Sequence, residues 1–335
     1  MKIVYLKQKS SFKNNLRSDT LWGLICWGIK TIYSEENLES FLGGYSEGRV
    51  VKLSSAFPYK NSIDKDKIRF YPKPISKPLN FNEYFESRGL KKKEEKAKSI
   101  AFMKKFKKTR YLDENTFKLF LAGELNEEAL FEIFSGGKTI ESLPEIETSD
   151  VLHNTINRLT NTTTTGAGSL FTTTEMFIKD GGLYFLLDGP DAEVSLVEGA
   201  LRFLEHFGFG GDSSIGKGHF DVEIKEFNTF DSLNKSDTFV SLSLYNPSNI
   251  ELEFFKENPE NTWYELETRK GKYGGHFEKP TKFWKKSLLM FKEGSVFPQH
   301  NDSPGQLVSV KDKESDVNHP IYQFGYAFNL PIKLK

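Results

Sequence analysis

The chain has 335 residues, 37% of them hydrophobic, and its 30 phenylalanines are enough for a sizeable core, so two domains are expected. Because the formal net charge is zero, any binding of nucleic acid must come from local basic patches. A protein that binds nucleic acid through overall positive charge is therefore excluded. The single cysteine, Cys26, excludes an internal disulfide, and no apolar run suits a signal peptide or a membrane span, so we expect a cytoplasmic protein.

The chain opens with a predicted strand and a predicted helix. Residues 2–9 are short, apolar-rich and β-branched, which is typical of a strand. Ser18 stands in N-cap position before an apolar helix that runs to Tyr33, and Asp19 complements the dipole of that helix. Residues 49–57 are then expected to form a strand closed by Pro58.

Residues 61–150 are interpreted as a large insertion. Over 61–78 the composition shifts to Pro, Lys and Asp, which indicates the start of an insertion and not more sheet. Residues 91–110 carry ten cations against two carboxylates, with apolar residues at every third position, and predict an amphipathic helix with a basic face. Since solvated faces normally mix signs, contact with a phosphate backbone and plain solvation stand as equal alternatives. More helix is expected over 113–134.

A segment rich in threonine and glycine follows the insertion. Arg158 offers a planar fork that grips phosphate or stacks on a base, and threonine hydroxyls can donate to phosphate oxygens. A lone histidine is more often structural than catalytic, and that alternative is kept for His153. Residues 169–178 and 183–188 are interpreted as a hairpin. The candidate contacts in this segment are His153, Arg158, Thr160, Thr163 and Thr164.

The densest glycine motif lies at residues 208–218, where five glycines fall within eleven residues. Glycine admits positive φ, and successive N–H groups in such a loop can bind an anion. Residues 211–217 match the spacing of a nucleotide P-loop, but Gly218 replaces the magnesium-binding hydroxyl, and the order is helix, loop, strand. A purely structural turn is the other alternative. The candidates are Gly208, Phe209, Gly210, Gly211, Asp212, Ser213, Ser214, Ile215, Gly216, Lys217 and Gly218.

A second sheet unit is expected from residue 237, with strands over 240–244, 263–268, 288–291 and 321–334 and a loop over 298–318. Between these strands lies a glycine-broken basic loop with aromatic residues. Cations interleaved with aromatic faces suit single-stranded RNA, and an ordinary surface hairpin is an equal alternative. The candidates here are Arg269, Lys270, Tyr273 and Lys285.

Helix, glycine-rich loop and strand form the ending of a βαββαβ unit. We therefore expect an α+β fold of two ferredoxin-like (RRM-like) units, one over 1–228 with the insertion at about 61–150 and one over 229–335. The glycine loop resembles the G-rich loop of RAMP proteins, the RNA-binding subunits of CRISPR effector complexes. Residues 16–23, 153–160 and 324–332 extend this resemblance to the fourth Csm subunit of type III-A complexes.

The resemblance implies a subunit in antiviral defence that caps the 5′ handle of the guide RNA. It implies the large polymerase-like subunit and the backbone RAMP subunit as partners. Target RNA is a further candidate partner, and we expect no membrane, metal or cofactor. It also places Ser18, Asp19 and Thr20 close to the guide RNA, where a helix start can bind phosphate.

Some RAMP relatives cut RNA with a histidine of the first helix as general base, but residues 18–33 contain no histidine. We therefore expect a non-catalytic subunit with no catalytic residues. The alternative is a metal-independent endoribonuclease that processes repeat RNA with His153 or His219 as its base.

Overall fold

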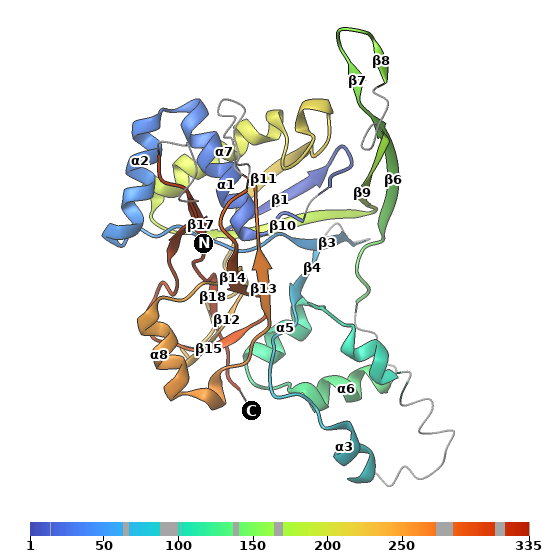
Figure 1. Cartoon of the computed structure of the whole chain (residues 1–335). Coiled ribbons are helices and arrows are strands. Elements are labelled where there is room, and N and C mark those ends of the chain that lie inside the picture. The colour runs from blue at the N-terminus through green and yellow to red at the C-terminus, as the bar shows by residue number, and fades with distance from the viewer. Residues whose placement is uncertain are drawn as a thin grey trace.

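The chain folds as a mixed α+β protein (Figure 1). The structure is a computed structural model, and it describes residues 1–13, 15–62, 67–87, 100, 102–136, 141–163, 170–272, 284–311 and 319–334.

An antiparallel sheet forms the centre of the N-terminal region. Its strand order is β11-β1-β10-β3-β4-β5, and β2 also pairs with β10. Successive side chains of a strand point to opposite faces, so Val4 and Leu6 of β1 enter one core while Ile3 and Tyr5 enter another. The strands are β1 (Lys2–Gln8), β2 (Lys52–Leu53), β3 (Phe57–Asn61), β4 (Lys67–Pro72), β5 (Tyr111–Asp113), β10 (Gly181–Asp188) and β11 (Phe220–Glu226).

Helices α1 (Ser18–Ile32) and α7 (Asp191–Phe207) cover one face of this sheet, and α2 (Glu35–Gly44) and the short η1 (Tyr45–Glu47) follow α1. The two long helices approach closely at Gly28, where a Cβ would lie 2.9 Å from the Cβ of Ala200. The apolar residues of α1 and α7 recur at helical spacing, which explains why each buries one stripe against the strands.

The other face of the sheet packs against the C-terminal region. Ile3 and Tyr5 of β1 share a core with Val240, Phe328 and Leu330, so the core is continuous across residue 228. The aromatic residues of the insertion helices complete this core. These helices are α3 (Phe81–Ser87), α5 (Glu114–Leu121) and α6 (Glu127–Ser135).

The C-terminal region contains a three-stranded sheet with β12 in its centre, in the order β15-β12-β18, and two separate strand pairs, β13–β14 and β16–β17. Helix α8 begins with a capping box between Ser248 and Glu251. The elements are β12 (Thr238–Ser241), α8 (Asn249–Glu257), η3 (Pro259–Asn261), β13 (Leu266–Arg269), β14 (Leu288–Phe291), β15 (Val296–Pro298), β16 (Leu307–Ser309), β17 (Tyr322–Phe324) and β18 (Asn329–Pro331).

A long two-stranded arm extends away from the body of the molecule (Figure 1). Its strands are β6 (Ile146–Asn154) and β9 (Leu170–Ile178), which pair from Ile146↔Ile178 to Asn154↔Leu170. The short pair β7 (Ile156–Asn157) and β8 (Thr162–Thr163) lies beyond them, at the described tip.

The structure confirms the strand at the N-terminus, the helices within 113–134 and the order of helix, glycine loop and strand at α7 and β11. Four local predictions are wrong. The segment expected to be a loop over 298–318 contains the strand β16, which pairs with β17. Residues 169–178 and 183–188 do not pair with each other, because β9 pairs with β6 while β10 enters the central sheet. The segment after Asn61 does continue the sheet, since β4 pairs with both β3 and β5 and its prolines begin only at its last residue. The strand expected over 49–57 is split into β2 and β3, and Pro58 lies inside β3.

Candidate nucleic-acid interface

The glycine loop joins α7 to β11 and is closed at its base by a hydrogen bond from the Phe209 N–H to the Gly218 carbonyl, at 2.7 Å. Gly218 has φ +69°, and a Cβ there would lie 2.1 Å from the carbonyl oxygen of Phe209. Only glycine suits this position, because the backbone is left-handed and the Phe209 backbone on the other side of the loop leaves no room for a Cβ. Gly208, Gly210, Asp212 and Gly216 also have positive φ.

The base of the loop is packed against protein, but its tip is open. Phe209 is buried and meets Phe220 edge-on, whereas Ser214 and Gly216 are exposed and the Ile215 side chain is 59% exposed. The short η2 helix (Ser213–Ile215) forms this tip. Since a polyanion can reach it, the loop retains a surface on which RNA could lie.

Part of the loop backbone has free donors. The N–H groups of Ile215, Gly216 and Lys217 donate to carbonyls within the loop. No described residue accepts a hydrogen bond from the N–H of Gly210 or Gly211. Two consecutive N–H groups beside left-handed backbone are suited to an anion.

Lys217 ties the glycine loop to the base of the arm. Its Nζ lies 2.7 Å from Oε2 of Glu175 on β9 and 3.0 Å from Oγ of Ser11. The hydrogen bond from Lys217 holds the pKa of Glu175 below its ordinary value. Lys13 forms an ion pair with Asp212 in the same way. A phosphate at this loop would therefore compete with carboxylates for both lysines.

The arm carries its predicted residues at the tip. Arg158, Thr160 and Thr163 are exposed there, and Thr164 lies outside the described residues. His153 stacks on Phe171 with ring centroids 5.3 Å apart, and its Nε2 lies 2.8 Å from Oγ1 of Thr173. These contacts tie His153 to the neighbouring strand of the arm.

The start of α1 is buried, and its side chains form hydrogen bonds with the C-terminal region. The Ser18 hydroxyl accepts a hydrogen bond from the Leu244 N–H at 3.0 Å. Asp19 accepts two from Arg269, at 2.9 and 3.0 Å. Thr20 is partly exposed, and its N–H and hydroxyl both donate to Asp19. The N-cap is Arg17 and not Ser18 as predicted, because the helix begins one residue earlier than expected.

Sequence reasoning missed the charged residues that surround this junction. Arg17 donates to Glu293 through two nitrogens and to Glu267 at 2.5 Å. Burial acts against its charge, but the hydrogen bonds to Glu293 and Glu267 outweigh it and raise the pKa of Arg17. The partners lie 250 or more positions away, so no local pattern could have indicated them.

Of the predicted basic loop of the C-terminal region, residues 270–272 directly follow β13 and residues 284–287 directly precede β14. Lys270 and Lys272 approach the ring of Trp284, with Nζ at 5.4 and 5.3 Å from its centroid, and Trp284 is exposed. Burial lowers the pKa of Lys285. Tyr273 lies outside the described residues. Lys270 and Lys272 therefore present a cationic and aromatic surface beside the Arg269–Asp19 pair.

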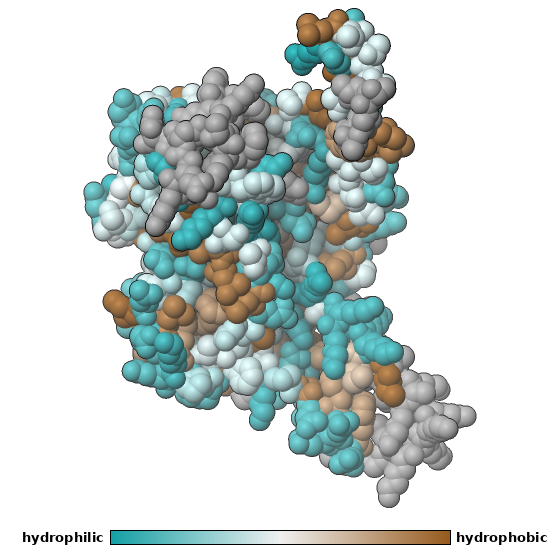
Figure 2. Space-filling model, viewed as in Figure 1, coloured by the Kyte–Doolittle hydropathy of each residue, from teal (hydrophilic) through white to brown (hydrophobic). Residues whose placement is uncertain are grey.

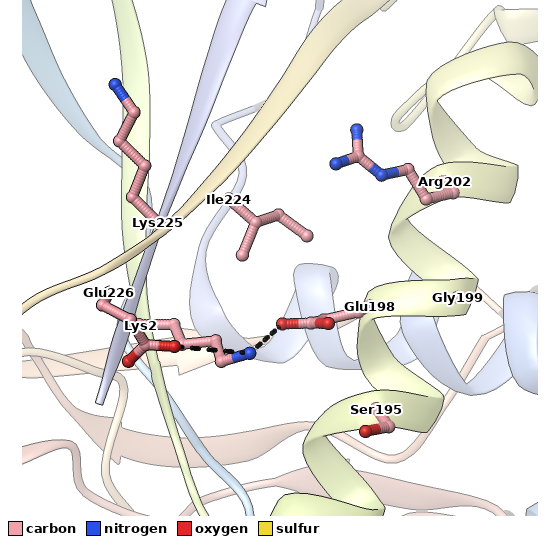
Figure 3. A pocket seen from close by; sticks show the side chains of 8 residues that line it. All are labelled: Lys2, Ser195, Glu198, Gly199, Arg202, Ile224, Lys225 and Glu226. Atoms are coloured by element: carbon pink, nitrogen blue, oxygen red, sulfur yellow. Dashed lines mark hydrogen bonds and ion pairs between the residues drawn. The ribbon is translucent and has the colours of Figure 1, made fainter.

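A shallow hollow of about 510 Å³ lies between α7 and β11 (Figure 3). Its cations already have partners. Lys2 pairs with Glu198 at 2.5 Å, Arg202 donates to the Val222 carbonyl at 2.7 Å, and Lys225 pairs with Glu223 at 2.6 Å. We therefore leave this hollow out of the candidate interface.

The described residues contain no group of three or more His, Cys, Asp and Glu side chains that could hold a metal ion. None of the helices in the described ranges is both long enough and apolar enough to cross a membrane.

The model of the RAMP superfamily matches residues 7–221, which include the glycine loop, the arm and both covering helices. The chain belongs to the RAMP superfamily. Residues 234–332 match the model of the CRISPR Csm4 C-terminal domain, so the resemblance to the fourth Csm subunit of type III-A complexes is confirmed.

The chain is 27% identical over 333 residues to the CRISPR system Cms protein Csm4 of Thermococcus onnurineus (strain NA1), an alignment that covers 99% of this chain and 96% of the relative. Its fold is similar to that of a solved Csm1–Csm4 cassette in complex with cA4, with a TM-score of 0.61, 21% identity and coverage of 100% and 98%. It is also similar to a Csm3–Csm4 subcomplex of the type III-A CRISPR-Cas interference complex, with a TM-score of 0.58, 20% identity and coverage of 99% and 100%.

Proposed function

We propose that this RAMP protein is a non-catalytic subunit of a type III-A CRISPR effector complex that binds the 5′ handle of the guide RNA. The observation that carries the proposal is the glycine loop, whose base is locked by Phe209 and Gly218 while its tip stays open. The match of residues 7–221 to the RAMP superfamily supports the assignment of that loop to RNA binding.

The topology supports a ferredoxin-like first unit over residues 1–228. If β1, β3, β10 and β11 are its four strands, the order β11-β1-β10-β3 is fourth, first, third, second, and α1 and α7 are its two helices. The glycine loop then joins the second helix to the last strand. We propose residues 229–335 as a second unit of the same kind, built around β12.

Guide RNA would be held by its sugar-phosphate chain. The N–H groups of Gly210 and Gly211 and the exposed Ser214 supply donors at the loop, while Arg158 supplies a guanidinium at the arm tip. Asp19 and Arg269 act on RNA only indirectly, because they neutralise each other. Contacts of this kind read no bases, which leaves target search to base pairing by the guide.

The neighbours in the complex would be a large polymerase-like subunit and a backbone RAMP subunit. The solved Csm1–Csm4 and Csm3–Csm4 assemblies support this choice. Target RNA is a further candidate ligand. The arm suits an interface as well, because it extends from the body and exposes apolar side chains (Figure 2).

The experiment measures binding of a fluorescent RNA with the guide 5′ sequence as a function of salt. Each phosphate contact adds to the salt slope, so Lys217→Gln combined with Arg158→Gln should weaken binding and lower the slope by about one to two. Glu175→Gln should strengthen binding, because it removes the carboxylate that competes for Lys217.

The matched control is Lys225→Gln combined with Lys235→Gln, which removes two exposed lysines outside the loop and the arm. Its slope should equal that of the unmodified protein. An unchanged slope in the Lys217 and Arg158 variant would exclude phosphate contacts at these residues and overturn the proposal.

The rival enzyme function is tested by incubating the protein with repeat RNA without metal. Our proposal expects intact RNA. Cleavage that His153→Ala abolishes would establish an endoribonuclease instead, although His153 is already engaged with Phe171 and Thr173.

A further inference from the structure

The insertion carries a second cationic surface that the glycine loop and the arm do not explain. Residues 102–107 are helical and lead through a turn at 108 to β5. Five cations are exposed here, and we name them the basic helix surface. They are Lys104, Lys105, Lys107, Lys108 and Arg110.

Phe106 fixes this surface to the body of the insertion. Its ring is buried and lies 5.3 Å from Phe131 and 5.5 Å from Phe134, centroid to centroid. Lys73 covers the same ring, with Nζ at 4.7 Å from its centroid. Phe106 points inward, whereas Lys105 and Lys107 beside it in sequence are exposed, and Lys107 also reaches back over α3, with its Nζ at 5.2 Å from the centroid of the Phe81 ring.

The carbonyl of Arg110 accepts a hydrogen bond from the Lys73 N–H at 2.9 Å, just after β4. The basic helix surface is therefore tied to the central sheet by backbone as well as by side chains. A ligand bound to it would be held in a defined position relative to the rest of the molecule.

These five cations form no ion pair with any described carboxylate, in contrast to much of the remaining charge. Lys2, Lys67 and Lys73 each pair with a glutamate within 2.8 Å. Lysines three and four residues apart on a helix repel one another, as Lys104 does Lys107 and Lys108. An anionic ligand would relieve that repulsion.

An aromatic face lies beside the cations. Phe102 is 43% exposed, and it stands three residues before Lys105, so the two share one side of the helix. Cations that neighbour an exposed aromatic ring suit a single-stranded nucleic acid, whose phosphates pair with lysine and whose bases stack on the ring. An acidic protein surface would need the cations but not the ring.

We infer that the basic helix surface binds single-stranded RNA, with phosphates on its lysines and a base on Phe102. The surface belongs to the insertion, whose helices α5 and α6 lie far from the arm tip at β7 and β8 (Figure 1). It is therefore a second RNA contact, separate from the glycine loop. The inference rests on the proposed function in one respect, namely that the strand belongs to the same guide or target RNA.

The test uses the full chain and three labelled single-stranded probes: an RNA of guide sequence, an RNA of target sequence and oligouridine. The variant replaces Lys104, Lys105, Lys107 and Lys108 with glutamine. For single strands the salt slope should fall by about two to three, and affinity at low salt should fall with it. Phe102→Ala should weaken binding without changing the slope, since it removes stacking and no charge.

Two controls match the variant. One replaces the same four lysines with arginine and should keep the slope. The other replaces Lys30, Lys225, Lys235 and Lys256, which lie outside the insertion, with glutamine and should also keep it. Far-UV circular dichroism verifies that each protein is folded, which is expected because the four replaced lysines are exposed, although Lys107 also covers the Phe81 ring.

An unchanged slope in the glutamine variant, or an equal loss in the second control, would overturn the inference. A protein-binding surface would give the first of these results. The proposed function is tested separately: it would still hold if the Lys217 and Arg158 variant lowered the salt slope, and it would be overturned if that variant left the slope unchanged. A loss confined to the guide or to the target probe identifies which strand is bound.

Discussion

Asp19 and Arg269 lie 250 positions apart and form a two-point ion pair that joins the start of α1 to the end of β13. The Asp19 carboxylate is almost fully buried, and it also accepts a hydrogen bond from Gln323 at 2.5 Å. The pair therefore connects the N-terminal region to the C-terminal region, at a place where the sequence alone indicated two separate RNA contacts.

Breaking this pair should destabilise the protein. Removing one partner of a buried ion pair leaves an uncompensated charge, so Arg269→Ala should lower the free energy of unfolding by about 3 kcal/mol. Asp19→Ala should have a similar effect, and the double variant should lose much less than the sum of the two because the residues interact directly. Urea denaturation measures all three.

The control for this cycle is the exposed pair Lys256–Glu253, whose loss should cost under about 0.5 kcal/mol. Additive effects of Asp19→Ala and Arg269→Ala would show that the pair does not join the two regions.

Two glycines of the loop should respond differently to alanine. Gly216→Ala meets no atom within 4 Å and should cost only about 1 kcal/mol for its left-handed backbone. Gly218→Ala should cost at least about 2 kcal/mol more, because its Cβ would collide with the Phe209 carbonyl. Equal free energies of unfolding for the two variants would contradict the closed base of the loop.

The stability of the protein should fall in acid through Glu114. Burial acts to raise the pKa of this carboxyl, but the two hydrogen bonds and the charge of Arg69 outweigh it and hold the pKa below the ordinary value of 4.5. A lowered pKa in the folded state stabilises the protein above pH 4.5, and that stabilisation is lost as pH falls through the folded pKa.

Glu114→Gln should therefore lower stability at pH 7 and flatten its decline below pH 4.5, as measured by urea denaturation across pH. Glu253→Gln serves as the control, since Glu253 is exposed. A decline below pH 4.5 of the same slope in Glu114→Gln and in the unmodified protein would rule out this contribution.

Apolar residues at the arm tip should matter for partners and not for folding. Leu159 is 96% exposed, so Leu159→Ser should change the free energy of unfolding by less than about 0.5 kcal/mol. Leu201→Ala, in the buried stripe of α7, should cost about 3 kcal/mol. If Leu159→Ser destabilised the chain as much as Leu201→Ala, the tip would have to pack against the body, contrary to the structure.

Some features followed from the sequence because they depend on neighbours along the chain. Apolar residues at helical spacing predicted α7, alternation predicted β11, and the glycines between them predicted a loop with left-handed backbone. The superfamily also followed, since short motifs carried it.

The pairing of distant groups was decided only by the tertiary structure. Lys217 was expected at a phosphate and lies against Glu175, and Asp19 was expected at RNA and holds Arg269. The predicted hairpin between β9 and β10 failed for the same reason. A strand pairs with whichever strand the fold places beside it, and for β9 that strand is β6. Local periodicity records which side of an element is buried, but it contains no information on which charged group will face it across the fold.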